Sequence, residues 1–345
     1  MNILYGVSGE GFGHASHAIV VANFLQKKGH KVIIATYGQA YELLKDKFNV
    51  ILINGFNLIY NEGILRHRKS FFYNAKPFLR TIKHRKKLKE AIKNFKPDLC
   101  ISDMEPIVSF LSYFYHIPLI SLSNQNRFVD FKINVPKKYL GDFLIAKIII
   151  KLFSPWKNYS IALSFSKLKQ IKKNSYIASP IIREDIRNLK FNDTGPIIVY
   201  LTKRNESSIR ALKKSSENYI VYGYDINKKE DNLHFKTRDF FLNDFVNCKA
   251  FISNSGFTSV GEAFYLKKPY FAIPLKGQFE QLYNALYIQK NGLGHYAEKL
   301  TLDNLNYFLS HLEVYKKNLI KHKFSSNEAV EILDRLLEKI RVNRK

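Results

Sequence analysis

Short apolar runs alternate with longer amphipathic stretches along most of this chain. The first apolar run, Asn2–Val7, is followed by a glycine-rich loop, an amphipathic stretch from Ala15 to Lys28 closed by Gly29, and a second apolar run, Lys31–Thr36. Apolar runs of this length, bounded by turn residues, are typical of buried strands, and the stretch between them has the spacing of a helix. Strand, helix and strand in this order predict a βαβ unit, and therefore a parallel sheet covered by helices.

The same alternation continues and predicts a second α/β domain, as the length of 345 residues also suggests. We expect a first domain at residues 1–155, a second at 156–324, and a last helix at 325–345. The pair Ser325 and Glu328 has the spacing of a capping box at the start of that helix. The later strands are predicted at Leu99–Ser102, Ile117–Leu122, Pro196–Leu201, Tyr219–Tyr222, Ala250–Ser253 and Tyr270–Ile273.

The chain is strongly basic, with a formal net charge of +26. Much of this charge lies between Arg66 and Lys96, where lysines and arginines are interleaved with Phe71, Phe72 and Tyr73. Such a stretch suits an anionic membrane surface or nucleic acid, and a merely solvated helix face is the plain alternative. Charge is the only feature that supports a nucleic-acid-binding module. No RNA-platform or zinc motif accompanies it, so no specific nucleic acid is expected.

Two further features bear on cellular location. Cys100 and Cys248 lie in or beside predicted strands, and we expect both to be buried, reduced thiols. A strand begins at Asn2 and no uncharged apolar run reaches the ~18–20 residues of a membrane span, so we expect a cytoplasmic protein, peripheral on the inner face of the membrane if the basic stretch binds lipid. The helix Asp142–Trp156 is interpreted either as a buried inter-domain helix or as an interfacial membrane element.

The first loop carries candidate chemistry. Gly9, Gly11 and Gly13 precede His14, which begins the first predicted helix. The spacing Gly-x-Gly-x-Gly, without an acidic residue closing the second strand, argues against a nicotinamide or flavin site. A histidine at a helix N-terminus is favoured in its neutral form, which a general base requires. His14 is therefore a candidate base, with a purely structural role as the alternative.

Two other polar residues follow predicted strands of the first sheet. Asp103 comes directly after Leu99–Ser102, and Gln125 comes shortly after Ile117–Leu122. The carboxyl ends of parallel strands form the edge at which open α/β sheets place their ligands. Asp103 is therefore a candidate site residue, although capping of the helix that starts at Pro106 is also open. Gln125 is a candidate for contact with a ligand bound at the same edge.

The densest candidate chemistry lies between residues 250 and 285. A turn, Asn254–Gly256, joins the predicted strand to a helix that Thr258 or Ser259 is expected to cap. A small-residue turn at a helix N-terminus gathers backbone N–H groups and the positive end of the helix dipole, which suits a diphosphate. Glu262, one turn further along, is placed to accept hydrogen bonds from ribose hydroxyls.

A second polar cluster opens the next helix, and its side chains suit the hydroxyls of a sugar: Gln278, Glu280 and Gln281.

This segment resembles the donor-binding region of the nucleotide-sugar glycosyltransferases with the GT-B fold. It is most similar to the glycosyltransferase family 1-like group, which is related to the lipid-linked N-acetylglucosaminyltransferase of peptidoglycan synthesis and to UDP-glucuronosyl and glucosyltransferases. The family usually carries glycine at the position of Ser255. The matching residues are Gly256, Phe257, Thr258, Glu262, Ala263, Lys268, Pro269, Pro274, Gln278, Glu280, Gln281, Asn284 and Ala285.

The resemblance implies two Rossmann-like domains facing a cleft, with the C-terminal helix crossing back to the first domain. It implies an inverting transferase that moves a sugar from a UDP-sugar to a hydroxyl acceptor, such as a membrane-associated lipid or a cell-envelope glycan. In such enzymes the glycine loop admits the acceptor, and His14 paired with Asp103 would act as the base. Lys203 and Arg204 stand where relatives have a glycine-rich phosphate loop and would help Ser255–Thr258 bind the diphosphate.

The chain contains no Asp-x-Asp string, so neither a metal ion nor a separate cofactor is expected. A nucleotide-sugar 2-epimerase on the same fold is the alternative enzyme, although the cluster of acidic and basic residues that it needs is not apparent. An epimerase would turn over a UDP-sugar without any acceptor, which separates the two hypotheses.

Overall fold

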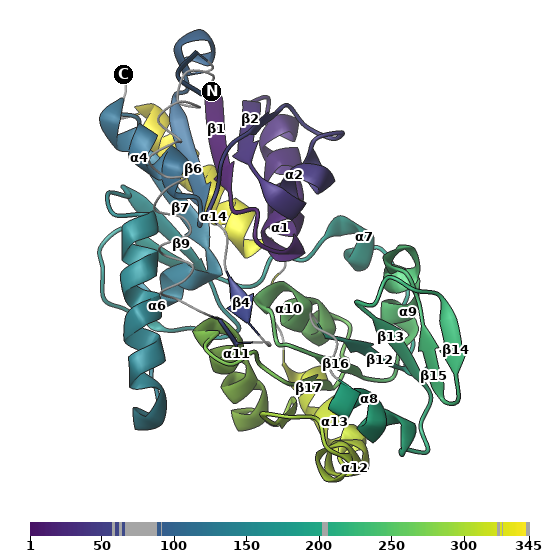
Figure 1. Cartoon of the computed structure of the whole chain (residues 1–345). Coiled ribbons are helices and arrows are strands. Elements are labelled where there is room, and N and C mark those ends of the chain that lie inside the picture. Colours follow the sequence, from purple (N-terminus) through teal and green to yellow (C-terminus); the bar gives the residue numbers. More distant parts are fainter. Residues whose placement is uncertain are drawn as a thin grey trace. The chain divides into compact units, whose positions relative to one another are not determined.

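The computed structural model describes residues 1–56, 59–61, 64–65, 88–90, 92–201, 206–322, 325 and 327–342. The chain forms two compact units (Figure 1). The first unit contains the described residues of 1–61 and 65–183 together with the last helix, and the second contains Ile64 and the described residues of 184–322. Lys203, Arg204 and the part of the basic stretch from 66 to 87 lie outside the described residues.

The first unit is built on a seven-stranded sheet whose strand pairs are all parallel. The chain adds strands in one direction from β1 to β3, and then returns to add the others on the opposite side of β1. The order therefore reverses between β1 and β6, which is the doubly wound, Rossmann-like arrangement. In spatial order the strands are β11 (Ser175–Ala178), β9 (Tyr159–Leu163), β7 (Leu119–Ser123), β6 (Leu99–Asp103), β1 (Asn2–Val7), β2 (Lys31–Thr36) and β3 (Val50–Leu52).

These strands are continuous apolar runs because helices cover the sheet and leave its central strands without contact with water. Ile3, Ile34, Ile101, Ile120 and Ile161, one from each of five neighbouring strands, are completely buried. The helices of the unit are α1 (Phe12–Lys27), α2 (Gly38–Leu44), α4 (Pro106–Phe114), α5 (Arg127–Asp130), α6 (Leu140–Phe153) and α14 (Glu328–Val342).

Short elements complete the first unit. They are β4 (Tyr60–Asn61), β5 (Ile64–Leu65), β8 (Phe131–Lys132), β10 (Lys169–Gln170) and the 3₁₀ turns η1 (Asn124–Asn126) and η2 (Lys137–Tyr139).

The first unit extends further along the chain than the expected boundary at 155. Strand β9 pairs with β7, and β11 pairs with β9, so both strands belong to the first sheet. The crossing to the second unit follows at 183 and 184. The sequence places two further apolar runs after residue 155, but their pattern does not reveal which sheet they join.

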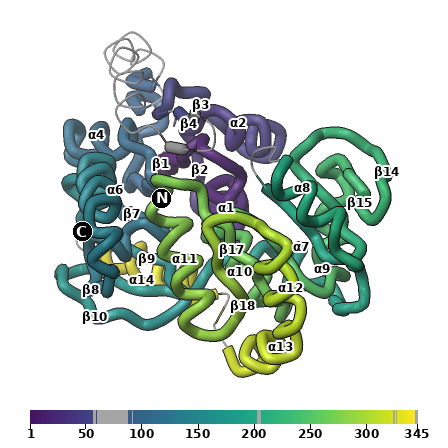
Figure 2. Tube along the Cα trace, turned by 60° about the horizontal axis from the view of Figure 1, so that its bottom comes forward, coloured from purple at the N-terminus to yellow at the C-terminus, as the bar shows by residue number. Residues whose placement is uncertain are grey.

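Helix α14 belongs to the first unit, where it lies beside β9 and β11 (Figures 1 and 2). Its apolar face, with Ile332, Leu336 and Ile340, is buried as its spacing predicts. The expected capping box is wrong, because the helix begins at Glu328 itself. The Glu328 carboxylate accepts hydrogen bonds from the backbone and hydroxyl of Ser179, both 2.9 Å long, and thereby attaches the helix to the end of β11.

The second unit has its own seven-stranded sheet, parallel except for the edge pair β14–β15. Its order also reverses once, between β12 and β16. In spatial order the strands are β14 (Lys228–Glu230), β15 (Leu233–Phe235), β13 (Tyr219–Tyr222), β12 (Ile197–Tyr200), β16 (Phe251–Ser253), β17 (Tyr270–Ala272) and β18 (Gly294–Tyr296).

The core of the second unit joins this sheet to its helices. Val199, Ile252, Phe271, Leu305 and Phe308 pack together in it and are almost fully buried. Both cysteines of the chain are buried and free, as predicted. The helices are α7 (Glu184–Arg187), α8 (Glu206–Lys213), α9 (Phe241–Asn247), α10 (Phe257–Tyr265), α11 (Phe279–Lys290), α12 (Leu302–Ser310) and α13 (Leu312–Lys321), with the 3₁₀ turn η3 (Arg238–Phe240) before α9.

Candidate active-site residues in the two units

Each sheet has one topological switch point, and a group of predicted site residues lies at each of them. In the first unit the switch point is between β1 and β6, where the glycine loop follows Val7 and Asp103 ends β6. In the second unit it is between β12 and β16, where the turn Asn254–Gly256 follows Ser253. Open α/β sheets bind their ligands at the carboxyl ends of the strands beside such a point. The topology therefore identifies the same two places as the sequence patterns.

The glycine loop of the first unit needs its glycines for space and for backbone conformation. A Cβ atom on Gly9 would lie 2.2 Å from the carbonyl oxygen of Tyr37, and Gly11 has a φ of 76°. Helix α1 begins at Phe12, earlier than predicted, so Gly13 is already helical. The loop is fixed to the neighbouring strand because the Ser8 backbone N–H donates to the carbonyl of Asp103 over 3.0 Å.

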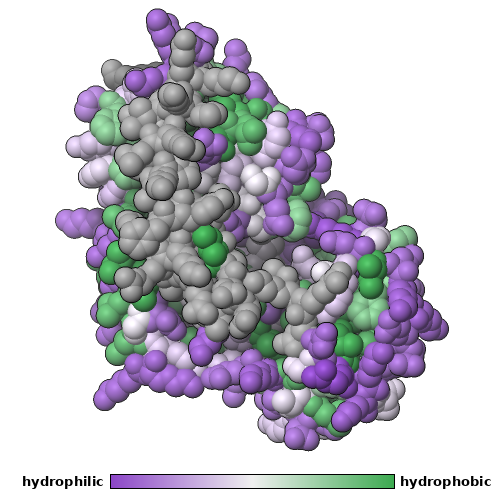
Figure 3. All heavy atoms as spheres, in the orientation of Figure 1, coloured by the Kyte–Doolittle hydropathy of each residue, from purple (hydrophilic) through white to green (hydrophobic). Residues whose placement is uncertain are grey.

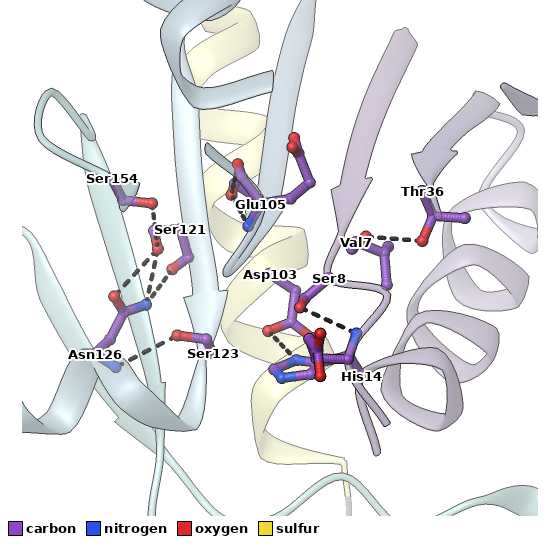
Figure 4. Close-up of polar contacts among 12 residues, drawn as sticks. Val7, Ser8, His14, Thr36, Asp103, Glu105, Ser121, Ser123, Asn126 and Ser154 are labelled. Atoms are coloured by element: carbon purple, nitrogen blue, oxygen red, sulfur yellow. Dashed lines mark hydrogen bonds and ion pairs between the residues drawn. The ribbon is translucent and has the colours of Figure 1, made fainter. Parts of the chain in front are cut away.

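His14 and Asp103 form a close pair. His14 Nδ1 lies 2.9 Å from Asp103 Oδ1, and the side chains are 15% and 0% exposed (Figure 4). His14 lies in the first turn of α1, and Asp103 ends β6, so the fold brings together two residues that the sequence separates. A carboxylate at this distance favours the neutral tautomer with the proton on Nδ1 and the lone pair on Nε2.

Two buried groups beside Asp103 stay uncharged at neutral pH. Burial lowers the pKa of His17 to about 4, with His14 acting in the same direction and Asp103 opposing it. Burial, followed by the charge of Asp103, raises the pKa of Tyr5 well above its usual value. His17 is 2% exposed. Both side chains therefore surround the carboxylate without adding charge.

Glu105, not Asp103, caps helix α4. Its carboxylate accepts hydrogen bonds from the backbone N–H groups of Ile107 (2.9 Å) and Val108 (2.7 Å). Glu105 is fully buried, and burial raises its pKa to about 7, although the two backbone hydrogen bonds oppose the shift. Sequence reasoning missed this residue. Its signal was present, because a carboxylate directly before proline at the first helical position is a typical cap.

Gln125 lies where the sequence predicts, in the turn η1 directly after β7 and at the same edge of the sheet as Asp103. The turn is held by its neighbours. Asn126 Nδ2 donates to the carbonyl and hydroxyl of Ser121, both over 3.0 Å, and the Ser123 hydroxyl accepts from the Asn126 backbone (Figure 4). The backbone that carries Gln125 is therefore rigidly placed at the edge of the sheet.

In the second unit the turn before α10 has an unusual backbone. Ser255 has a φ of 56°, in the left-handed region that favours glycine, and it is fully buried. Glycine would adopt this backbone conformation without strain. Two contacts of the Ser255 hydroxyl offset the strain, because Oγ lies 2.7 Å from the Asn254 carbonyl and 2.8 Å from the Gln281 carbonyl.

Helix α10 begins at Phe257, with Gly256 as its N-cap residue and no acidic residue in its first turn. The predicted caps are wrong, since no side chain caps this helix; the Ser259 hydroxyl instead donates to the Gly256 carbonyl over 2.9 Å. The first backbone N–H groups of any helix lack intrahelical acceptors, and the helix dipole makes this end positive. Thr258 is half-buried in the first turn, and Glu262 is buried one turn further on.

Helix α11 supports this turn. Asn284 Nδ2 donates to the Ser255 carbonyl over 2.9 Å, and Gln281 Oε1 accepts from the Leu275 backbone over 2.9 Å. Gln281 therefore fixes the loop before α11 with the side chain that was predicted to bind the sugar. Gln278, the N-cap residue of α11, and Glu280 in its first turn are half-buried.

Lys268 is one of the residues that match the family motif, and no function was predicted for it from the sequence. Its ammonium group is almost fully buried and donates to the carbonyls of Cys248 (2.7 Å) and Asn192. Burial lowers its pKa. The side chain thus joins the segment after α10 to the segment before β16 and to the beginning of the second unit.

Two further findings concern the described residues alone. They contain no group of three or more His, Cys, Asp or Glu side chains placed to hold a metal ion. Within those same residues, every helix is too short or too polar to cross a membrane.

Comparison with known sequences gives a consistent family. The profile of Glycosyl transferase family 1 matches residues 1–313. An uncharacterized glycosyltransferase of Methanosarcina mazei is 24% identical over 85% of each chain. The UDP-N-acetylglucosamine–N-acetylmuramyl-(pentapeptide) pyrophosphoryl-undecaprenol N-acetylglucosamine transferase of Thermosipho melanesiensis is 24% identical over 97% of each chain.

Two solved glycosyltransferases have folds similar to that of this chain. The spinosyn rhamnosyltransferase SpnG in complex with thymidine diphosphate has a TM-score of 0.65 at 14% identity, covering 98% of this chain and all of its own. The calicheamicin glycosyltransferase CalG4 has a TM-score of 0.59 at 14% identity, covering 96% of this chain and 94% of its own.

Proposed function

This chain belongs to glycosyl transferase family 1 and has the GT-B fold, and we propose that it transfers a sugar from a UDP-sugar to a hydroxyl acceptor with inversion and without a metal ion. The observation that carries the proposal is the pair of His14 Nδ1 and Asp103 Oδ1, 2.9 Å apart at the switch point of the first unit. This pair has the arrangement that a general base requires.

The base acts through His14 Nε2. Asp103 holds the Nδ1 proton, orients the ring and stabilises the imidazolium that forms when Nε2 takes the proton of the acceptor hydroxyl. The acceptor oxygen then bonds to the anomeric carbon as the bond from that carbon to the diphosphate oxygen breaks. A single displacement of this kind inverts the anomeric configuration. The tight loop of Gly9, Gly11 and Gly13 lets the acceptor approach the backbone closely.

The second unit holds the leaving group. The backbone of Ser255, Gly256, Phe257 and Thr258 forms the start of α10, and a diphosphate at this end is stabilised by N–H groups and by the helix dipole. The charge that develops on the departing diphosphate makes this interaction stronger in the transition state than in the ground state. Lys203 and Arg204, outside the described residues, would add positive charge.

The rest of the donor is assigned to polar side chains of the same unit. Glu262, one turn into α10, is proposed to accept hydrogen bonds from the ribose hydroxyls. Gln278 and Glu280, at the start of α11, are proposed to bind the sugar, and Gln281 contributes through the amide nitrogen that its contact with Leu275 leaves available to donate. The absence of an Asp-x-Asp string from the sequence supports a mechanism in which the helix dipole and basic groups replace a metal ion.

The choice of UDP and of the acceptor rests on the relatives and on the charge of the chain. The relative from Thermosipho melanesiensis is named for a UDP-sugar donor and an undecaprenol-linked acceptor, whereas SpnG was solved with thymidine diphosphate. The net charge of +26 suits an anionic, membrane-borne acceptor lipid or cell-envelope glycan, and peripheral attachment to the membrane.

The proposal is tested by incubating the protein with UDP-glucose, UDP-N-acetylglucosamine or UDP-glucuronic acid, and with octyl glycosides as hydroxyl acceptors. We expect acceptor-dependent release of UDP with one of the donors, and nuclear magnetic resonance should show a product of inverted anomeric configuration. Conversion of the donor without any acceptor would indicate an epimerase. A product with retained configuration would overturn the single displacement by His14.

A further inference from the structure

Helix α6 turns its most apolar side toward solvent. Of its fourteen residues only Ile150 is buried, so the interpretation as a buried inter-domain helix is wrong. Leu144, Ile145, Ile148 and Leu152 are 55%, 39%, 58% and 56% exposed. Large apolar side chains that are exposed together on one element often mark an interaction surface.

The exposed residues form one continuous strip. Positions 144, 145, 148 and 152 recur at helical spacing and share a face, whereas Ile150 lies on the opposite side. The packed side is anchored by aromatic contact, with the ring centroids of Phe153 and Phe56 5.2 Å apart. The fold therefore fixes the helix by one side and leaves the other side exposed. That side is formed by Leu144, Ile145, Ile148 and Leu152 and is here called the apolar strip.

Aromatic residues extend this surface beyond the helix. Trp156 follows α6 and stacks on Tyr113 of α4 with ring centroids 4.1 Å apart, and both are about half exposed. Phe114 and Tyr115, at the end of α4, are exposed as well. Figure 3 shows hydrophobic surface among hydrophilic residues at the left of the view, where Figure 1 draws α6. Tryptophan and tyrosine rings with one apolar and one polar edge are typical of membrane–water interfaces.

Positive charge borders the apolar strip. Lys147 and Lys151 lie on one flank of it, and the acidic residue of the helix, Asp142, lies on the other. At the end of α6 a hollow of about 320 Å³ is lined by Lys151, Lys157, Lys172 and Lys173. The carboxylate that lines it, Asp130, is buried and paired with Lys157 at 2.5 Å. An apolar strip bordered in this way complements an anionic lipid surface.

We propose that α6 is a membrane-docking element, which lies in the plane of an anionic bilayer surface with its apolar strip inserted and its lysines among the headgroups. Amphipathic helices with an apolar face, lysines on the flank and interfacial aromatic rings bind membranes in this way. The inference deepens the proposed function, because it names the surface by which the enzyme reaches a membrane-borne acceptor.

Vesicle sedimentation of the full-length protein tests the inference. The vesicles are made of phosphatidylcholine alone or of equal parts phosphatidylcholine and phosphatidylglycerol. We expect binding to the anionic vesicles, and at least a tenfold loss of partitioning for the double variant Ile148→Ser, Leu152→Ser. The double variant Lys147→Gln, Lys151→Gln should lose about thirtyfold on anionic vesicles, because each lysine near such a surface contributes a factor of about five.

The matched control is Ile320→Ser, because Ile320 is 62% exposed on α13 of the second unit. It should bind vesicles as the unchanged protein does. If the α6 variants bind vesicles as well as the unchanged protein does, the inference is overturned and any binding belongs to other basic segments. A dimer in analytical ultracentrifugation that the Ile148→Ser, Leu152→Ser change dissolves would assign the strip to a second copy instead. Binding of UDP by all variants, followed by thermal shift, separates failure of this inference from failure of the proposed transferase.

Discussion

The Nδ1 atom of the His14 imidazole lies 2.9 Å from the carboxylate oxygen Oδ1 of Asp103. This contact connects the first turn of α1 to the last residue of β6 across the switch point of the first sheet. Asp103 has no exposed surface, whereas His14 retains some, so the buried member orients the member that can meet a substrate. The orientation of the ring determines which of its nitrogens faces a substrate.

Replacing Asp103 with asparagine should lower kcat by about a hundredfold to ten-thousandfold, because an amide no longer selects the Nδ1–H tautomer of His14. The dissociation constant for UDP should stay unchanged, since the nucleotide is assigned to the other unit. Steady-state kinetics and calorimetry measure the two quantities. His14→Ala should be similarly impaired, and the double variant should be hardly worse than either single one, because the residues act together. Full additivity would show that they act separately.

Replacing Ser255 with alanine should lower the free energy of unfolding by about 1–2 kcal/mol, because the buried hydroxyl contacts are lost while the left-handed backbone remains. Ser255→Gly loses the same contacts but relieves the backbone strain, so it should be closer to the unchanged protein. Urea denaturation compares the two variants. An alanine variant as stable as the glycine variant would contradict the strained conformation.

Glu105 should make stability fall as pH rises. Its pKa is about 7 in the folded protein, above the usual 4.5, so between these values the folded state keeps a proton that the unfolded state has lost. The free energy of unfolding should therefore decrease by about 2–3 kcal/mol between pH 5 and pH 8 through this group. Glu105→Gln should remove that part of the decrease. Denaturation curves of both proteins at the two pH values measure it, and equal slopes with pH would refute the assignment.

Removal of divalent metal ions should leave transfer unaffected. The proposed leaving-group site uses the N-terminus of α10 rather than a bridging ion. Activity is therefore expected to be the same in excess EDTA as in added magnesium or manganese. A loss of activity that only a divalent ion restores would show that the diphosphate needs a metal, and the metal-independent part of the mechanism would be wrong.

The sequence predicted the central strands well, because each of them appears in the sequence as a short apolar run. The runs Asn2–Val7, Lys31–Thr36 and Tyr219–Tyr222 are strands with the predicted bounds. The assignment of β9 and β11 failed, because an apolar run shows that a strand is buried but not which neighbours it pairs with.

The candidate site was likewise predicted only in part from the sequence. The motif pattern located the turn at Ser255 and the loop before His14, but it did not separate residues that line a site from residues that support one. Gln281 and Asn284 hold the turn and the adjoining loop through hydrogen bonds, and Glu105 provides the cap that was an open alternative for Asp103. Such roles depend on contacts between segments distant in the chain, and only the folded arrangement reveals them.

A crystal structure of the protein with UDP would locate the leaving-group site. We expect the diphosphate to lie against the backbone N–H groups of Gly256, Phe257 and Thr258 at the start of α10. Its ribose should then approach Glu262. A diphosphate bound elsewhere, with the start of α10 free of ligand, would contradict the assignment of the leaving-group site and the transfer mechanism that depends on it.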